Sequence, residues 1–117
     1  MSIILRRIYE ENDTLGGHRI LIDRIWPRGI SKENARLDDW MKDIAPSSSL
    51  RKWFNHDPAK FESFKKAYRK EIKENAEGQL KLEELKKIAT NNRLILLLGA
   101  KDQEYNHAVV LKEIIEE

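Results

Sequence analysis

Residues 94–98 constrain the fold most, because five apolar residues follow one another there with no polar residue between them. A strand that has one face in water alternates apolar and polar residues, whereas a strand covered on both faces is apolar throughout. Strands of this second kind are typical of parallel sheets. The sequence therefore predicts a parallel sheet whose two faces are covered by helices.

Two further strands are expected earlier in the chain, over residues 3–9 and 19–25. Residues 10–18 between them carry Asn, Asp and Gly and predict a loop. Pro27 cannot donate a ladder hydrogen bond and Gly29 permits a turn, so the second strand is expected to end there. The loop is short for a parallel crossover, and on the residues alone the first two strands predict a hairpin.

Helical spacing of apolar residues predicts four helices between the second strand and residues 94–98. The first is expected from Ser31 to about Ala45, where Pro46 stops it. Ser47 or Ser48 can cap a short second helix that ends at Asn55-His56. A third helix starts at Asp57-Pro58 and ends near Gly78. A fourth ends at residues 91–92. The expected inward positions of these four helices are Leu37, Trp40, Met41, Ile44; Leu50, Trp53, Phe54; Phe61, Phe64, Tyr68, Ile72; and Leu82, Leu85, Ile88, Ala89.

Asp102 is placed to cap a last helix, whose buried side contains His107 or Ala108 together with Leu111, Ile114 and Ile115. The order of elements predicts a single small layered α/β domain over residues 1–117. We expect a mostly parallel sheet of about three to four strands, flanked by helices. The tryptophans Trp26, Trp40 and Trp53 are expected in the core, because each occupies an apolar helical or strand-end position.

The composition excludes several function classes. The chain has no cysteine, which removes thiol nucleophiles, cysteine-bound zinc and redox motifs. No apolar run approaches the roughly 18 residues of a membrane span, and arginines interrupt the apolar start of the chain, so a cytoplasmic protein is expected. The three histidines lie far apart, and neither a metal nor a cofactor is expected. The net charge of +2 is too small for a strong nucleic-acid footprint.

Polar residues follow two of the predicted strands, at the ends where ligands collect in parallel α/β sheets. Asp23, Arg24 and Arg28 follow the second strand. After residues 94–98 come Lys101 and Asp102, and then Asn106 and His107. These residues supply acid, base and cationic groups. Alternatively, Asp102 is only a helix cap, His107 a core histidine, and Asp23 one half of a structural ion pair.

The segment 46–58 is a second candidate, because serine hydroxyls, Arg51 and His56 lie close to a helix start there. Capping explains the serines and Asp57 equally well. Seven of the nine arginines precede residue 52, and a guanidinium binds carboxylate or phosphate as a planar fork. An anion site is therefore expected in the first half of the chain.

Four motifs in order resemble the YeaO-like family, a branch of the superfamily catalogued as domain of unknown function 488. The resemblance covers nearly all of the chain and implies a compact α/β fold with a mostly parallel sheet. It also implies that the polar motif residues, Lys42 and Ser47 among them, converge near one crevice. The motifs are residues 20–29, Trp40-Met41-Lys42 with Ala45-Pro46-Ser47, residues 50–58, and Ala100-Lys101-Asp102 with Asn106-His107-Ala108.

The chain departs from the family pattern at two places. Where members of the wider superfamily often look like Cys-His-Arg, this chain has Asn106-His107-Ala108, so thiol chemistry cannot operate here. Where the YeaO-like pattern usually has a tyrosine, this chain has Leu98. The resemblance to the wider superfamily implies that the first two strands are parallel, whereas the residues alone predict a hairpin. The direction of the first strand therefore stays open.

Two functions from different classes follow. The first is a small enzyme that acts on a phosphate-bearing or nucleotide-like anionic substrate, with Asp23, Asp102 or His107 moving protons. Substrate binding is then assigned to Arg24, Arg28, Lys42, Ser47, Arg51, His56, Lys101 and Asn106. The alternative is a non-catalytic module that binds an anion, with nucleic acid as a weakly supported partner. No membrane partner is expected, and the oligomeric state does not follow from the sequence.

Overall fold

The computed structural model describes residues 1–10 and 16–117, and its centre is a four-stranded sheet. The strands are β1 (Ser2–Arg7), β2 (His18–Leu21), β3 (Asp39–Trp40) and β4 (Arg93–Leu98). Their order is β1-β4-β2-β3, and every pair is parallel. The expected α/β fold is confirmed. The hairpin prediction is wrong, because β4 lies between β1 and β2; part of the predicted loop, residues 11–15, lies outside the described residues.

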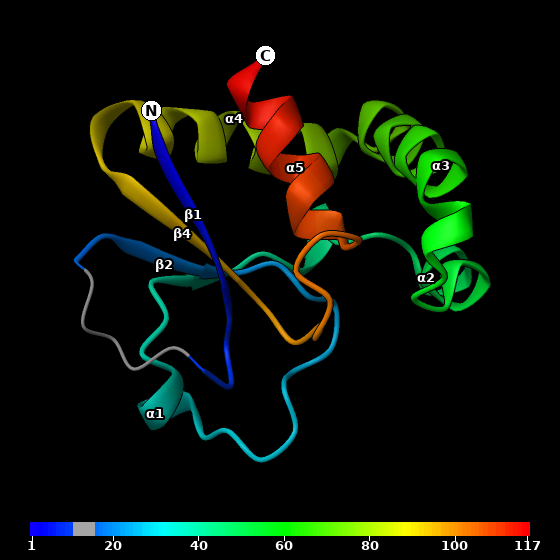
Figure 1. The fold of residues 1–117 in the computed structure, drawn as a ribbon. Coiled ribbons are helices and arrows are strands. Elements are labelled where there is room, and N and C mark those ends of the chain that lie inside the picture. Colours follow the sequence, from blue (N-terminus) through cyan, green and yellow to red (C-terminus); the bar gives the residue numbers. More distant parts are fainter. Residues whose placement is uncertain (11–15) are drawn as a thin grey trace.

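The two faces of β4 explain its unbroken apolar run. Leu94, Leu96 and Leu98 belong to a large core cluster under the helices α2 (Ser48–Phe54), α3 (Phe61–Glu74), α4 (Ala76–Asn91) and α5 (His107–Glu116). Ile95 and Leu97 belong to a smaller cluster on the other face. Figure 1 shows α4 and α5 over one face and α1 on the opposite side. Helices therefore cover one face, and the single-turn α1 (Lys32–Ala35) with its flanking loops covers the other.

The predicted helix over residues 31–45 is wrong. Helix α1 ends at Arg36, which is left-handed (φ 49°), and the chain then forms β3 and a 3-10 turn, Lys42–Ile44. The apolar residues that suggested one helical stripe pack on opposite faces of the sheet. Leu37 and Trp40 contact the smaller cluster, whereas Met41 and Ile44 lie in the large one. A single helix cannot present one stripe to both faces.

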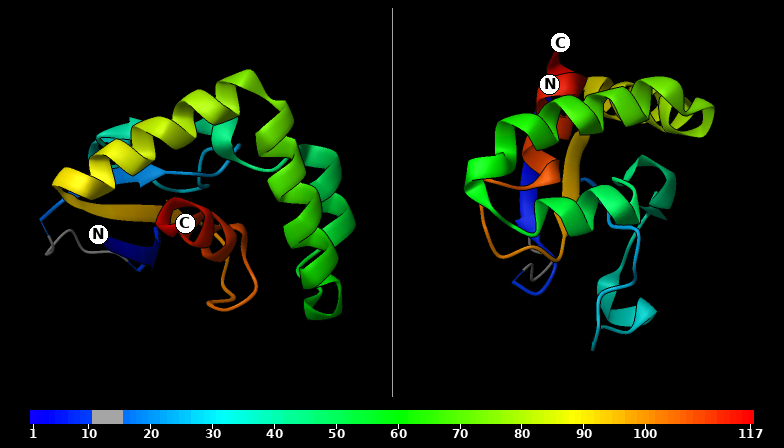
Figure 2. Two further views of the ribbon diagram at one scale, coloured as in Figure 1. Left: turned by 90° about the horizontal axis from the view of Figure 1, so that it is seen from above. Right: turned by 90° about the vertical axis from the view of Figure 1, so that its right-hand side faces the viewer.

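The remaining helices are α2 (Ser48–Phe54), α3 (Phe61–Glu74), α4 (Ala76–Asn91) and α5 (His107–Glu116), and a 3-10 turn, Pro58–Lys60, precedes α3. Figure 2 shows α2 and α3 side by side at one end of the molecule. None of the described helices has the length and hydropathy of a bilayer-spanning segment.

Several helix details differ from the sequence predictions. Gly78 does not stop α3 but is buried within α4, and the break falls at Asn75, whose side chain caps α4. The cap of α5 is Asn106 rather than Asp102. Trp53 is 45% exposed on α2 and is not a core residue. The predicted stripe of α3 is confirmed, since all four of its members are buried: Phe61, Phe64, Tyr68 and Ile72.

Candidate functional site

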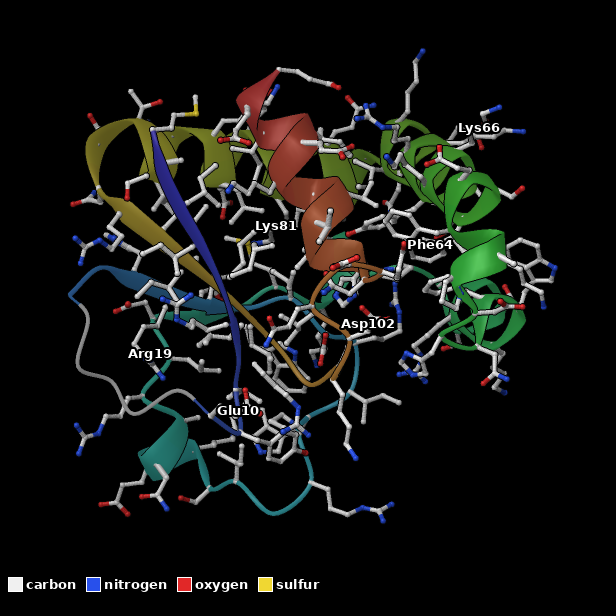
Figure 3. All side chains as sticks on the ribbon, viewed as in Figure 1. Glu10, Arg19, Phe64, Lys66, Lys81 and Asp102 are labelled. Carbon is white, nitrogen blue, oxygen red and sulfur yellow. The ribbon has the colours of Figure 1, made fainter. Side chains whose placement is uncertain are left out.

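A pocket of about 380 Å³ lies beyond the carboxyl ends of β2 and β4. Its lining comes from the residues after these two strands, from α2 with the segments on either side of it, and from the start of α5 with the residues just before it. Phe64 on α3 completes the lining. Figure 3 labels Phe64 on α3 and Asp102 in the connection before α5, and these two segments flank this end of the sheet. The pocket is therefore at the place where ligands bind in parallel α/β folds.

Asp23 and His107 form the best-ordered part of the pocket. The Asp23 Oδ2 atom accepts a hydrogen bond from the Gly99 backbone N–H at 2.8 Å, and Oδ1 is 3.2 Å from His107 Nε2. The same Nε2 atom is 3.0 Å from the Ile22 carbonyl oxygen. Both neighbours of Nε2 are acceptors, so we assign the proton of the neutral ring to Nε2, which donates to them. Nδ1 then carries the lone pair.

The Asp23 backbone is held as firmly as its side chain. The Trp40 indole Nε1 donates to the Asp23 carbonyl oxygen at 2.7 Å, and the Trp40 ring meets Trp26 edge-on at 5.2 Å between centroids. A side chain at Gly99 would meet Asp23 Oδ2 at 3.3 Å, so the close approach of this carboxylate favours glycine. Asp23, Arg24 and His107 form the wall of the pocket at the strand ends, the strand-end wall. Contacts from both faces of the sheet hold this wall in place.

Arg24 lines the pocket but is occupied by the fold. Its Nε donates to the Pro46 carbonyl at 3.2 Å and its Nη2 to the Ala45 carbonyl at 3.0 Å. These bonds tie the end of β2 to the segment that enters α2. Arg24 therefore contributes positive charge to the pocket while its fork already holds two backbone carbonyls.

The opposite wall of the pocket, the α2 wall, contains Arg51, Lys52 and His56, and its side chains are not used by the described part of the fold. Arg51 and Lys52 are exposed and line the pocket, and neither side chain makes a hydrogen bond or ion pair within residues 1–10 and 16–117. Together with Arg24 they set three cationic side chains against the single carboxylate of Asp23. The excess positive charge favours an anionic occupant.

His56 completes this wall from a strained backbone position. Asn55, the C-cap of α2, has φ 46°, and His56 has φ 56°. The left-handed region costs an L-residue roughly 1–2 kcal/mol, although Asn and His adopt it more often than most other residues. The His56 side chain lines the pocket and makes no hydrogen bond within the described part of the chain. The fold thus keeps a strained residue where a glycine would fit.

Five of the residues predicted for the site do not line the pocket: Arg28, Lys42, Ser47, Lys101 and Asp102. Arg28 and Lys101 are exposed outside it. The ammonium of Lys42 lies over the Trp40 ring, 4.4 Å from its centroid. The Ser47 hydroxyl donates to Glu71 Oε2 at 2.5 Å and accepts from the Leu50 N–H, as a helix cap does.

Asp102 acts in the connection before α5. Its Oδ1 accepts from the backbone N–H groups of Glu104 and Tyr105 at 2.9 and 3.0 Å. These bonds, that of Tyr105 first, hold the pKa of the Asp102 carboxyl below its ordinary value. Asn106 lines the pocket but is a cap: its Oδ1 accepts from the Val109 N–H, and its Nδ2 donates to the Asp102 carbonyl. Both side chains therefore shape the connection.

Tyr68 lies beneath the strand-end wall and is fully buried. Its hydroxyl donates to the Ile44 carbonyl at 2.5 Å, and its ring meets His107 edge-on at 6.2 Å. Burial raises the pKa of this phenol far above its ordinary value, and the negative charges of Glu71 and Asp23 add to the effect. Tyr68 therefore stays neutral and supports His107 from below.

Six of the residues that the sequence predicts for the site line this pocket, and the sequence analysis did not single out several other lining residues. The six are Asp23, Arg24, Arg51, His56, Asn106 and His107. Lys52 and Asn55 lie inside the candidate segment 46–58, so their neighbours in the chain were the available signal. Tyr105 directly precedes Asn106-His107 and also lines the pocket, together with Phe54 and Phe64. Among the described residues, no group of three or more His, Asp or Glu could hold a metal ion.

Comparison with known proteins places the chain in a family. Residues 2–117 match the family described as the inactive DUF488-N3 subclade. The chain belongs to this family. It is 38% identical over 113 residues to the uncharacterized protein YeaO of Escherichia coli K12. This match covers 97% of this chain and 96% of YeaO.

Relatives of this chain also occur in mycobacteria. It is 37% identical over 109 residues to uncharacterized proteins of Mycobacterium tuberculosis H37Rv and Mycobacterium bovis, a match that covers 93% of this chain and 89% of each relative. No solved structure matches the chain. The predicted YeaO-like membership is confirmed, and the relatives are uncharacterised.

Proposed function

We propose that this protein is a binding module for a small anionic molecule, with a phosphate group as the preferred anion. The observation that supports it is the α2 wall, where Arg51 and Lys52 face the pocket without a protein partner among the described residues. Charged donors that the fold leaves unused are available to a ligand. The family description, an inactive subclade, favours binding without turnover.

The pocket favours a small molecule over a long polyanion. Its volume of about 380 Å³ falls within the range of small-ligand sites, roughly 300–1,000 Å³. Nucleic-acid backbone binding needs several phosphate contacts along a surface, whereas the cations here gather at one hollow. We expect the protein in the cytoplasm, a prediction that rests on the sequence.

The test is calorimetric titration with inorganic phosphate and ribose 5-phosphate. We expect the double variant Arg51→Gln, Lys52→Gln to weaken binding at least about tenfold, because each charged hydrogen bond contributes roughly 1.5–3 kcal/mol. Lys66→Gln with Lys70→Gln removes the same charge from exposed positions on α3, outside the pocket, and is the matched control. Equal loss in both double variants, or no binding to wild type, would remove the proposal.

A second candidate function is proton transfer on the bound molecule, which the Asp23–His107 hydrogen bond favours. Asp23 would orient the imidazole through Nε2, and Nδ1 would accept the proton. The test is phosphorus NMR of phosphate monoesters incubated with wild type and with His107→Gln. Turnover that the variant lacks would favour the enzyme, and unchanged spectra with retained binding would favour the binding module.

A further inference from the structure

The floor of the pocket is aromatic. Phe54 on α2, Phe64 on α3 and Tyr105 in the connection before α5 all line it. Phe54 stacks on Phe64 with ring centroids 4.3 Å apart, and Phe61 meets Tyr105 edge-on at 5.3 Å and lies 6.1 Å from Phe54. The rings form one connected group from the α3 core to the pocket. The anion proposal makes no use of this group.

Tyr105 is the member of the group that a ligand can reach. Phe54 is 5% exposed and Phe64 1% exposed, whereas Tyr105 is partly exposed. Its backbone N–H donates to Asp102 Oδ1, and its ring packs against Phe61 with an angle of 76° between the two ring planes. The Tyr105 hydroxyl has no hydrogen bond within residues 1–10 and 16–117. A ring that its neighbours hold in place and that is partly exposed in the pocket offers a surface for stacking.

The same pocket contains unpaired backbone groups. Ala100 lines the pocket, and neither its N–H nor its carbonyl oxygen makes a hydrogen bond with the described residues. The neighbouring Gly99 differs, because its N–H donates to Asp23 and its carbonyl accepts from Arg7 Nε. A donor and an acceptor on one residue match the edge of a nitrogen heterocycle, which carries both kinds of group.

We propose that the pocket takes an aromatic base joined to a phosphate, that is, a nucleotide, with the base against Tyr105 and the phosphate against the α2 wall. This proposal rests on the proposed anion site and adds the base to it. A sugar phosphate would satisfy Arg51 and Lys52 but leave Tyr105 and the Ala100 backbone groups unused. The same chemistry occurs in a free nucleotide and at the end of a nucleic-acid strand, and the test separates these sources.

The experiment compares adenosine 5′-monophosphate, uridine 5′-monophosphate and ribose 5-phosphate by calorimetric titration of the full chain. Base stacking on an aromatic side chain contributes roughly 1–3 kcal/mol, so the nucleotides should bind about 5- to 150-fold tighter than ribose 5-phosphate. Tyr105→Ala should remove this preference and leave the affinity for ribose 5-phosphate unchanged. Trp53→Ala is the matched control, because Trp53 is an exposed ring that does not line the pocket.

The outcomes separate the base from the anion. Equal affinity of wild type for nucleotides and ribose 5-phosphate would overturn the base and leave the anion site standing, whereas no binding of any phosphate would overturn both. Should Tyr105→Ala melt far below wild type, Tyr105→Leu keeps the packing on Phe61 and tests the same loss of preference. A 5′-phosphorylated single-stranded oligonucleotide that binds more tightly than the mononucleotide, with a steep salt dependence, would assign the base to a nucleic-acid end.

Discussion

The two walls of the pocket differ in what their polar groups do. On the strand-end wall, Asp23, Arg24 and His107 are each hydrogen-bonded to protein groups and partly or largely buried. On the α2 wall, Arg51 and Lys52 are exposed without such partners among the described residues. Groups of the first kind stabilise the fold, whereas groups of the second kind are free to bind a ligand. Substitutions on the two walls should therefore affect different measurements.

Asp23→Asn should have the largest effect on stability. The carboxylate accepts from both Gly99 N–H and His107 Nε2–H, whereas an amide has one acceptor oxygen and turns its NH₂ group toward the other donor. We expect the free energy of unfolding to fall by about 2–3 kcal/mol. Urea unfolding at neutral pH measures the loss.

Asp43→Asn is the matched control for this substitution. Asp43 is exposed, and its carboxylate makes no hydrogen bond or ion pair with the part of the chain that the structure describes. Its stability should change by less than about 0.5 kcal/mol. Similar losses in Asp23→Asn and Asp43→Asn would mean that the strand-end wall is no more structural than the surface.

The structure shows where sequence reasoning succeeds and where it stops. The run 94–98 correctly predicted a central parallel strand, because burial on both faces excludes polar residues from it. The helix predicted over 31–45 failed, because spacing along the chain does not tell which face of the sheet a residue reaches. Leu37 and Met41 belong to different clusters although both fit one helical stripe.

Pairing within the site was equally hard to predict. Asp23 and His107 were both candidate residues, but they are distant in sequence, and only the parallel order of β2 and β4 brings them together. Arg24 looked like an anion ligand, and its fork instead holds two carbonyls. A residue type sets what a side chain can bind, whereas the tertiary fold decides whether that capacity is already used.

Tyr68→Phe should have the next largest effect on the free energy of unfolding. It tests the buried side chain that packs against His107 of the strand-end wall. The change leaves the Ile44 carbonyl without its donor in the core, at a cost of about 1–2 kcal/mol in the free energy of unfolding. The folded-state pKa of Tyr68 is raised, so its contribution is complete below the pH at which an unfolded tyrosine ionises, about 10, and is lost as pH rises above it. Wild type should therefore lose stability more steeply than Tyr68→Phe in alkaline solution.

Alkaline titration of tyrosinate absorbance checks the Tyr68 assignment. In wild type, ionisation of Tyr68 should coincide with unfolding, since the buried phenol must reach water first. The step that coincides with unfolding should shrink in Tyr68→Phe. Reversible ionisation of all three tyrosines in the folded protein would contradict the burial of Tyr68 and its support of His107.

His56→Gly, on the α2 wall, should raise the free energy of unfolding, whereas the substitutions on the strand-end wall lower it. Glycine removes the left-handed strain at φ 56° but adds freedom to the unfolded chain, so we expect a gain of up to about 1 kcal/mol in the free energy of unfolding. His56→Ala keeps a Cβ atom at the same backbone position and should show no gain. Phosphate affinity should fall in both variants, since both lose the imidazole. A stability loss in His56→Gly would show that the imidazole holds the fold together.

Arg51→Gln should have the smallest effect on stability. Arg24→Gln, the same substitution on the strand-end wall, provides the comparison. The Arg51 side chain is exposed and makes no hydrogen bond or ion pair within the described residues, so the free energy of unfolding should change by less than about 0.5 kcal/mol. The same substitution at Arg24 removes donors from the Ala45 and Pro46 carbonyls and should cost about 1–2 kcal/mol. Urea unfolding of both variants in phosphate-free buffer measures the difference. Added phosphate should then stabilise wild type more than Arg51→Gln, because only a wall that the fold leaves unpaired gains stability from a ligand.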